Sequence, residues 1–279
     1  MITRPDPARP PVALTIAGSD SSGGAGIQAD LKTFTALGVY GASAVTALTA
    51  QNTEGVSGVW SPGVDVVRAQ IRAVFDDLTI GAVKTGMLGD VATVTAVAEE
   101  LIGLDGVPVV VDPVMVATSG DRLLAPDAID SVRVRMVPLA DVLTPNLPEA
   151  AVLLECGEAR DEAEARRQVR ALHALGARAV LLKGGHGAGA ASVDLFFDGR
   201  EVVTLAHPRI DTLNTHGTGC TLSAAIAAFL AAGLPVREAV TRAKSFVWQA
   251  IAAARGQRLG KGHGPVDHLF AIKGNPRPA

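Results

Sequence analysis

The sequence predicts an α/β fold, with a mostly parallel central sheet, helices on both faces and a small β-hairpin at one edge. Three observations lead to this expectation. Short apolar runs typical of strands alternate along the chain with segments of helical periodicity. Asp198-Gly199 is a two-residue turn signal between two further strand-like runs. With 48% hydrophobic and 19% charged residues, the 279-residue chain can bury the core of one large domain.

The expected strands are short, β-rich apolar runs. They are residues 12–17, 43–50, 82–85, 107–111, 142–143 and 179–182, followed by 193–197 and 201–205 for the hairpin. The expected helices are 26–37, 64–78, 91–104, 126–137 and 162–175, a helix beginning near Glu149, and two final helices at about 221–232 and 236–254. We expect residues 11–273 to form a single domain between flexible tails at 1–10 and 274–279, which carry proline and charge without periodicity.

Composition excludes several classes of protein. A net charge of −3 and a pI near 6.1 give no basic surface for nucleic acid or an anionic membrane. Two cysteines, Cys156 and Cys220, are too few for a disulfide framework and suit a reducing cytoplasm. The uncharged runs 217–236 and 33–53 are not expected to cross a membrane, because each is interrupted by glycine or proline and the first is mainly a short, alanine-rich helix.

The segment 214–221 places glycines, hydroxyls and a thiol at the start of an alanine-rich helix. The first turn of a helix has unpaired N–H groups and a positive dipole end, and glycine lets the backbone approach a phosphate closely. The same position is expected to lower the pKa of Cys220, so that part of the thiol is ionised near neutral pH. The alternative is a glycine-rich loop with a buried, inert cysteine.

A second glycine-rich turn, residues 18–26, follows the first strand and opens the first helix. Its Gly24-x-Gly26-x-x-Ala29 pattern fits a loose form of the dinucleotide fingerprint. The acid expected some 20 residues later could only be Glu54, which lies past the next strand, so a nicotinamide or flavin enzyme is a weak alternative. The sequence has no G-x-x-x-x-G-K-[ST] phosphate loop.

Polar residues follow several predicted strands, where open α/β sheets bind their ligands. The carboxamide of Gln51 suits the edge of a heteroaromatic ring, although it could simply cap its strand. Asp112 and Glu149 could hold Mg²⁺ or serve as helix caps. Lys183 could meet phosphate oxygens or lie solvated beside a turn, and Asp30 could bind a ligand or interact with a helix dipole.

Read together and in order, nine motifs resemble one family. They are ALTIAGSD (13–20), GGAGIQADLKTF (23–34), TAQNT (49–53), KTGML (84–88), VDPVM (111–115), TPNLPE (144–149), KGGH (183–186), THGTGCT (215–221) and GHGP (262–265). From about residue 12 to 270 the chain is similar to the hydroxymethylpyrimidine/phosphomethylpyrimidine kinases of thiamin biosynthesis, within the ribokinase-like superfamily.

The resemblance implies a three-layer α/β/α ribokinase-like fold. It also implies ATP-dependent phosphorylation of 4-amino-5-hydroxymethyl-2-methylpyrimidine and then of its monophosphate to the diphosphate, at one site. Mg²⁺ is implied as cofactor, dependence on K⁺ is left open, and a cytoplasmic homodimer is expected that binds neither nucleic acid nor membrane.

The resemblance also implies roles for individual residues. The pyrimidine would be bound by Gly18, Asp30, Gln51, Met87 and Val114; ATP by Asn146, Lys183 and Thr215; and Mg²⁺ by Asp112 and Glu149. The catalytic group would be Gly217, Thr218, Gly219 and Cys220, with Cys220 where most ribokinase-like sugar kinases carry an aspartate base.

Two rival functions remain open at this stage. A pyridoxine or pyridoxal kinase of the same superfamily shares several motifs, although Gln51-Asn52-Thr53 favours the pyrimidine and a secondary pyridoxal activity stays open. A catalytically silent pyrimidine-binding protein would keep the ring pocket and lose the phosphate machinery. That second alternative is disfavoured by the presence of Asp112, Glu149, Lys183 and Cys220.

Overall fold

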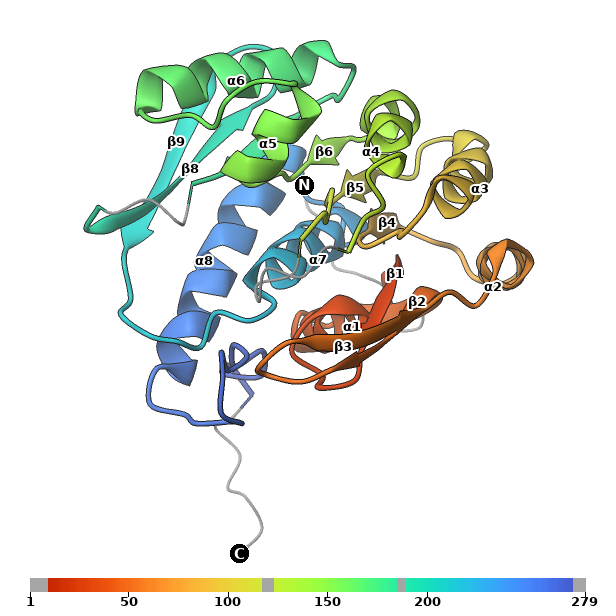
Figure 1. The fold of residues 1–279 in the computed structure, drawn as a ribbon, viewed down its shortest axis with the longest axis horizontal. Coiled ribbons are helices and arrows are strands. Elements are labelled where there is room, and N and C mark those ends of the chain that lie inside the picture. The colour runs from red at the N-terminus through yellow and green to blue at the C-terminus, as the bar shows by residue number, and fades with distance from the viewer. Residues whose placement is uncertain (1–9, 117–122, 185–188, 273–279) are drawn as a thin grey trace, which may run out of the picture.

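A mixed sheet runs through the part of the chain that the computed structural model describes, residues 10–116, 123–184 and 189–272. Within these residues its nine strands have the order β3-β2-β1-β4-β5-β6-β7-β8-β9 (Figure 1). The strands are β1 Val12–Asp20, β2 Tyr40–Gln51, β3 Val56–Trp60, β4 Ala82–Thr85, β5 Val109–Val111, β6 Val142–Leu143, β7 Val180–Lys183, β8 Ala191–Phe197 and β9 Val202–Pro208. The six strands from β2 to β7 in this order are parallel. β3 pairs antiparallel with β2, β8 with β7, and β9 with β8.

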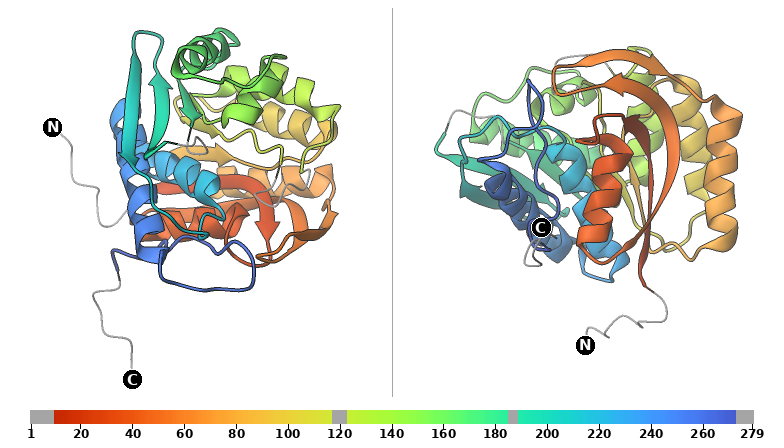
Figure 2. Two further views of the ribbon diagram at one scale, coloured as in Figure 1. Left: turned by 60° about the vertical axis from the view of Figure 1, so that its left-hand side comes forward. Right: turned by 90° about the horizontal axis from the view of Figure 1, so that it is seen from below.

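Helices cover both faces of this sheet (Figures 1 and 2). They are α1 Gly26–Ala36, α2 Val64–Asp77, α3 Val91–Ile102, α4 Ala128–Ser131, α5 Leu147–Leu153, α6 Glu162–Ala174, α7 Thr218–Ala231 and α8 Val236–Ala254. Among the described residues, none of these helices is long and apolar enough to cross a membrane.

Two hydrophobic clusters fill the spaces on either side of the sheet. Val83 of β4 belongs to the cluster that contains Val97 of α3, whereas its neighbour Ala82 belongs to the cluster with Phe34 of α1 and Ile226 of α7. Successive strand residues point to opposite faces, so the central strands β1, β4, β5, β6 and β7 each contribute to both clusters. The predicted fold, a three-layer α/β/α sandwich with a mostly parallel sheet and the β8–β9 hairpin at one edge, is confirmed.

Some boundaries differ from the prediction. β3 was not predicted; it is a short, partly exposed edge strand containing Gly58. β2 begins before Gly41, where a Cβ would lie 2.8 Å from Leu31 and 2.9 Å from Phe34 of α1, so the glycine serves close packing rather than a strand break. The helix predicted at 126–137 winds instead as α4, a π-helical turn over Val132–Met136 and a 3₁₀ turn over Val137–Leu139.

Two further outcomes concern the ends of segments. α7 begins at Thr218, three residues earlier than predicted, which places Gly219 and Cys220 in its first turn. The predicted tails lie outside the described residues, except for residue 10, and the single-domain assignment over 11–273 stays a prediction.

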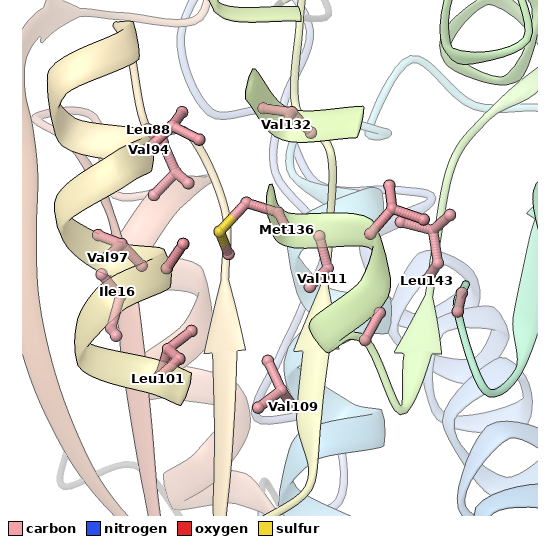
Figure 3. Packing of buried hydrophobic residues seen from close by; sticks show 14 of the residues in the cluster. Ile16, Leu88, Val94, Val97, Leu101, Val109, Val111, Val132, Met136 and Leu143 are labelled. Carbon is pink, nitrogen blue, oxygen red and sulfur yellow. The ribbon is translucent and has the colours of Figure 1, made fainter. Parts of the chain in front are cut away.

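We predict that Met136→Ala lowers the free energy of unfolding by about 2–5 kcal/mol, because the side chain is fully buried and its removal leaves a cavity. Figure 3 shows Met136 among Val97 and Val111 in the core. Urea unfolding at equilibrium measures the change. Val134, 67% exposed in the same segment, is the matched control, and Val134→Ala should change the value by less than about 0.5 kcal/mol. Equal effects of the two substitutions would contradict this packing.

Candidate active site

The carboxyl ends of the parallel strands meet at one edge of the sheet, and α7 begins there. Asp112 directly follows β5 at this edge, and only 1% of it is exposed. Its Oδ1 accepts hydrogen bonds from Lys183 Nζ at 2.9 Å and Thr144 Oγ1 at 3.2 Å, and its Oδ2 accepts one from Ser223 Oγ at 3.0 Å. Burial raises the pKa of Asp112, but Lys183 and Lys84 outweigh that effect and the net shift is downward. Asp112 is therefore an ionised carboxylate.

Lys183 ends β7 and lies between two carboxylates. Its Nζ is 2.9 Å from Asp112 Oδ1 and 3.8 Å from Glu149 Oε2. Burial lowers the pKa of Lys183, but Asp112 and Glu149 raise it further, so the ammonium stays charged. The alternative of a freely solvated Lys183 is excluded, because only 14% of its side chain is exposed and its ammonium is paired with Asp112.

Glu149 lies beside Lys183 and also caps the start of α5. It forms a capping box with Asn146 at the start of α5: the Asn146 side chain accepts from Glu149 N, and the Glu149 carboxylate accepts from Asn146 N, both at 2.8 Å. Burial raises the pKa of Glu149 to about 7, with Lys183 lowering it and Asp112 raising it. The capping interpretation is thus correct for this residue, and it does not exclude a ligand on the remaining lone pairs.

The start of α7 faces the same lysine. Gly217 is the N-cap in a left-handed conformation with φ of 76°, and a Cβ there would lie 1.9 Å from the carbonyl oxygen of Gly24. A Cβ on Gly219 would lie 3.3 Å from Lys183 Nζ. Within the described structure no side chain caps this helix. The Thr218 N–H donates to the Thr215 carbonyl at 3.3 Å, whereas the N–H groups of Gly219 and Cys220 are available to an anion beside the ammonium.

Cys220 lies in this first turn, but the expected lowering of its pKa is wrong. Burial raises the pKa of the thiol to about 11. Lys84 lowers it and the Gly26 N–H hydrogen bond to the sulfur lowers it slightly, whereas Asp30 and Asp112 raise it. The helix start alone does not decide the ionisation, because two carboxylates from distant parts of the sequence lie near the thiol.

Asp30 of α1 and Lys84 of β4 form a fully buried ion pair. Lys84 Nζ is 2.7 Å from Asp30 Oδ2, which also accepts from Thr15 Oγ1 at 2.6 Å. Among the described groups, Asp30 Oδ1 has no hydrogen-bond partner. Asp30 was predicted to bind the pyrimidine. Its unpartnered Oδ1 is buried and its Oδ2 is occupied by Lys84 and Thr15, so this role stays a prediction.

The other predicted acceptor residues lie around the ends of β1, β2 and β4. A Cβ on Gly18 would be 3.1 Å from Met87 Sδ, so these two residues are in contact. Met87 also lines a largely apolar cavity of about 370 Å³ with Thr46 and Val59. Gln51 lies 3.5 Å from the His216 ring. Val114 stands two residues after Asp112, and its N–H donates to the Asp112 carbonyl at 2.8 Å. The structure therefore brings Gly18 and Met87 together and places Gln51 beside His216, just before the start of α7.

Asp112 and Glu149 fit a magnesium ion that is held mainly by phosphates and water. Mg²⁺ is usually bound by one or two carboxylates together with substrate phosphates. Both carboxylates contact Lys183. Among the described residues no group of three or more His, Cys, Asp or Glu side chains could hold a metal by itself.

Several residues of this site were not assigned from the sequence. Thr144 and Ser223 hold Asp112, Lys84 pairs with Asp30, and His216 pairs with Asp20. A charged lysine inside the buried strand β4 was the one signal that could have pointed to an ion pair. The KGGH motif is described only to Gly184, so its final residues lie outside the described structure.

An ammonium and two carboxylates beside an uncapped helix start, at the carboxyl edge of a parallel sheet, define the class of enzymes that transfer phosphoryl groups. Residues 20–267 match the model of the phosphomethylpyrimidine kinase family, and the chain belongs to this family.

Individual relatives agree with this membership. The chain is 57% identical over 258 residues to the hydroxymethylpyrimidine/phosphomethylpyrimidine kinase of Rhizobium meliloti, covering 92% of this chain and 97% of the relative. The solved phosphomethylpyrimidine kinase of Clostridium difficile is 41% identical with a TM-score of 0.76, covering 86% of this chain and 99% of that one. The pyridoxal kinase of Staphylococcus aureus, solved with AMP-PCP and pyridoxal, is 35% identical with a TM-score of 0.87, covering 95% of each chain.

The raised pKa of Cys220 predicts how its reactivity depends on pH. In a Cys156→Ser background, alkylation of Cys220 by iodoacetamide should be slow at pH 7 and accelerate about tenfold per pH unit between pH 8 and 10, since only the thiolate reacts. Mass spectrometry of the labelled peptide gives the rate. Protein unfolded in urea is the control, with half-maximal reactivity near ~8.5. A plateau already at pH 8 in the folded protein would show that the pKa is not raised.

Proposed function

We propose that this chain transfers the γ-phosphoryl group of ATP to the hydroxymethyl group of 4-amino-5-hydroxymethyl-2-methylpyrimidine, and then phosphorylates the monophosphate to the diphosphate, in thiamin biosynthesis. The observation that carries the proposal is the proximity of the Asp112–Lys183 pair to the first turn of α7, where a Cβ on Gly219 would lie 3.3 Å from Lys183 Nζ and 3.9 Å from Asp112 Oδ2. Family membership and the printed activity of relatives such as the Rhizobium meliloti kinase support it.

On the donor side, Lys183 and the first-turn N–H groups of Gly217 to Cys220 would stabilise the charge on the transferred phosphoryl group. Asn146 and Thr215 would contact the remaining phosphates. Mg²⁺, when bound at Asp112 and Glu149, would neutralise phosphate charge. Lys183 is already oriented by Asp112, so its charge needs little reorganisation when a nucleotide binds.

On the acceptor side, Gln51 and the backbone near Met87 would read the edge of the aminopyrimidine, with Gly18, Asp30 and Val114 completing the pocket. Thr46 Oγ1 donates to the Met87 carbonyl at 2.6 Å and fixes this backbone. A rigid edge reader of this kind would discriminate between heteroaromatic rings through the hydrogen bonds that a wrong ring leaves unpaired.

Cys220 would accept the proton of the attacking hydroxyl. At pH 7 a pKa of about 11 leaves only about one thiol in 10⁴ ionised. Phosphoryl transfer depends mainly on alignment and charge stabilisation, so modest help in removing the proton is sufficient. The sign of the shift means that a thiolate base would make turnover rise with pH through the neutral range.

Assembly and location complete the proposal. We infer a homodimer from the family resemblance, and the paired residues Leu48 of β2 and Trp60 of β3, 51% and 58% exposed, offer an apolar surface for a second copy. A reducing cytoplasm agrees with the free thiols of Cys156 and Cys220.

A coupled assay of ADP release tests the proposal. With ATP and Mg²⁺, we expect turnover with the hydroxymethylpyrimidine and with its monophosphate, and loss of both activities when the metal is chelated. Activity with pyridoxal alone would overturn the substrate assignment in favour of a pyridoxal kinase. The similarity to the Staphylococcus aureus pyridoxal kinase is the reason for including this substrate.

Cys220→Ala serves as the chemical control in this assay. If Cys220 is the base, kcat should fall severely while calorimetric binding of the pyrimidine persists, and the pH dependence of the residual kcat should flatten. Near-normal turnover by the folded variant would refute the assignment of the base without affecting that of the substrate.

A further inference from the structure

The two glycine-rich segments of this chain are used in opposite ways. At the end of β1, the carboxylate of Asp20 accepts hydrogen bonds from the N–H groups of Ser22 at 2.8 Å, Gly24 at 3.0 Å and Ala25 at 2.8 Å, and from the Ser22 hydroxyl. Backbone turns of this kind bind anions. Here the anion is Asp20 itself, 2% exposed, so these N–H groups are not available to a phosphate.

The closed turn, residues 20–25, is joined to the start of α7 by His216. Its Nε2 lies 2.9 Å from Asp20 Oδ2, and the residue is 6% exposed. Because a carboxylate only accepts hydrogen bonds, Nε2 carries the proton in this contact. A Cβ on Gly24 would lie 2.4 Å from the ring of His216, which explains why glycine stands at that position.

The backbone of His216 is fixed on its other side. Its N–H donates to the Gly264 carbonyl at 3.0 Å, and His216 forms a bridge with Pro265. The same C-terminal segment reaches the end of β2, where the Thr53 carbonyl accepts from His263 N at 3.0 Å. In Figure 2 this blue segment runs beside the red and orange elements of the N-terminal part. The GHGP motif thus fixes the backbone of His216 through Gly264 and Pro265.

His216 lies between the two halves of the active site. It directly precedes Gly217, the N-cap of α7, and its Nε2 is 3.5 Å from Gln51 Nε2. Since the proton on His216 Nε2 is directed to Asp20, this nitrogen cannot accept from Gln51. The Gln51 amide nitrogen therefore stays available to a ligand, while its oxygen accepts from Thr49 Oγ1 at 3.2 Å and the ring limits its position.

We propose that His216 is a positioning residue: through Asp20 it sets the separation between the acceptor end of the site, at Gln51, and the anion-binding start of α7, at Gly217. This inference rests on the proposed function. It assigns His216 no contact with the reacting atoms. Alignment of the two reactants contributes strongly to rate, and a displacement of about 1 Å costs on the order of 10²-fold.

His216→Ala and His216→Gln test this role by steady-state kinetics. The alanine variant should lower kcat for both acceptors on the order of 10²-fold, with the calorimetric Kd of ADP changed by less than about threefold. Glutamine should restore much of kcat, because its amide nitrogen is as many bonds from Cβ as Nε2 of histidine and can donate to Asp20. His207→Ala is the matched control, since His207 is half-buried and stacks on Trp248 away from the site, and its kcat should not change.

Asp20→Asn tests the His216–Asp20 hydrogen bond by changing the acceptor. This variant keeps the positioning role of His216 testable even if His216→Ala fails to fold. It should lower kcat, and combining it with His216→Gln should cost little more than the worse single change, because both substitutions act on one contact. Unchanged kcat in folded His216→Ala and Asp20→Asn, or equal impairment of the alanine and glutamine variants, would overturn the inference. If the unsubstituted protein phosphorylates neither acceptor, the proposed function fails instead.

Discussion

The buried carboxylate of Asp112 is the interaction on which this site depends. Its oxygens join the end of β6 through Thr144, the end of β7 through Lys183 and the second turn of α7 through Ser223. Its own N–H donates to Thr85 at the end of β4. An ionised group at this depth is tolerated only when its charge is paired and its lone pairs are used, and removing one partner of such a pair costs about 3–5 kcal/mol. Asp112 therefore links four elements at the sheet edge, in addition to the backbone pairing of the strands.

This arrangement explains why we propose an anion site at the start of α7 and not at the start of α1. Lys183, directed by Asp112, lies against Gly219, and the first turn of α7 keeps its N–H groups free of side-chain caps in the described chain. The turn before α1 has as many glycines, but Asp20 occupies its N–H groups. Glycine content alone does not distinguish the two loops; the position of a carboxylate within one of them does.

The sequence was sufficient for the parallel strands and most helices, because strands covered on both faces are continuous apolar runs bounded by polar residues. It was insufficient for β3, whose Trp60 is exposed and whose Gly58 interrupts the pattern, and for the first turn of α7, since glycine and threonine favour helices poorly.

The properties of the site residues could be predicted from the sequence only in part, because they depend on contacts between distant parts of the chain. The pKa of Cys220 is raised mainly by burial and further by Asp30 and Asp112, 190 and 108 positions earlier, while Lys84 lowers it. The partner of His216 is Asp20, 196 positions away. A motif can identify such residues as important, and only their juxtaposition shows what each one does. The roles of Gln51, Asn146 and Thr215 stay predictions.

The most direct test of the account is a crystal structure with ADP, Mg²⁺, a trigonal phosphoryl analogue such as aluminium fluoride, and the hydroxymethylpyrimidine. The account predicts the analogue between Lys183 Nζ and the first-turn N–H groups of Gly219 and Cys220, the metal on the side of Asp112, and the hydroxymethyl oxygen next to Cys220 Sγ. A nucleotide whose phosphates lie instead in the turn at residues 21–25, with Asp20 displaced, would contradict it.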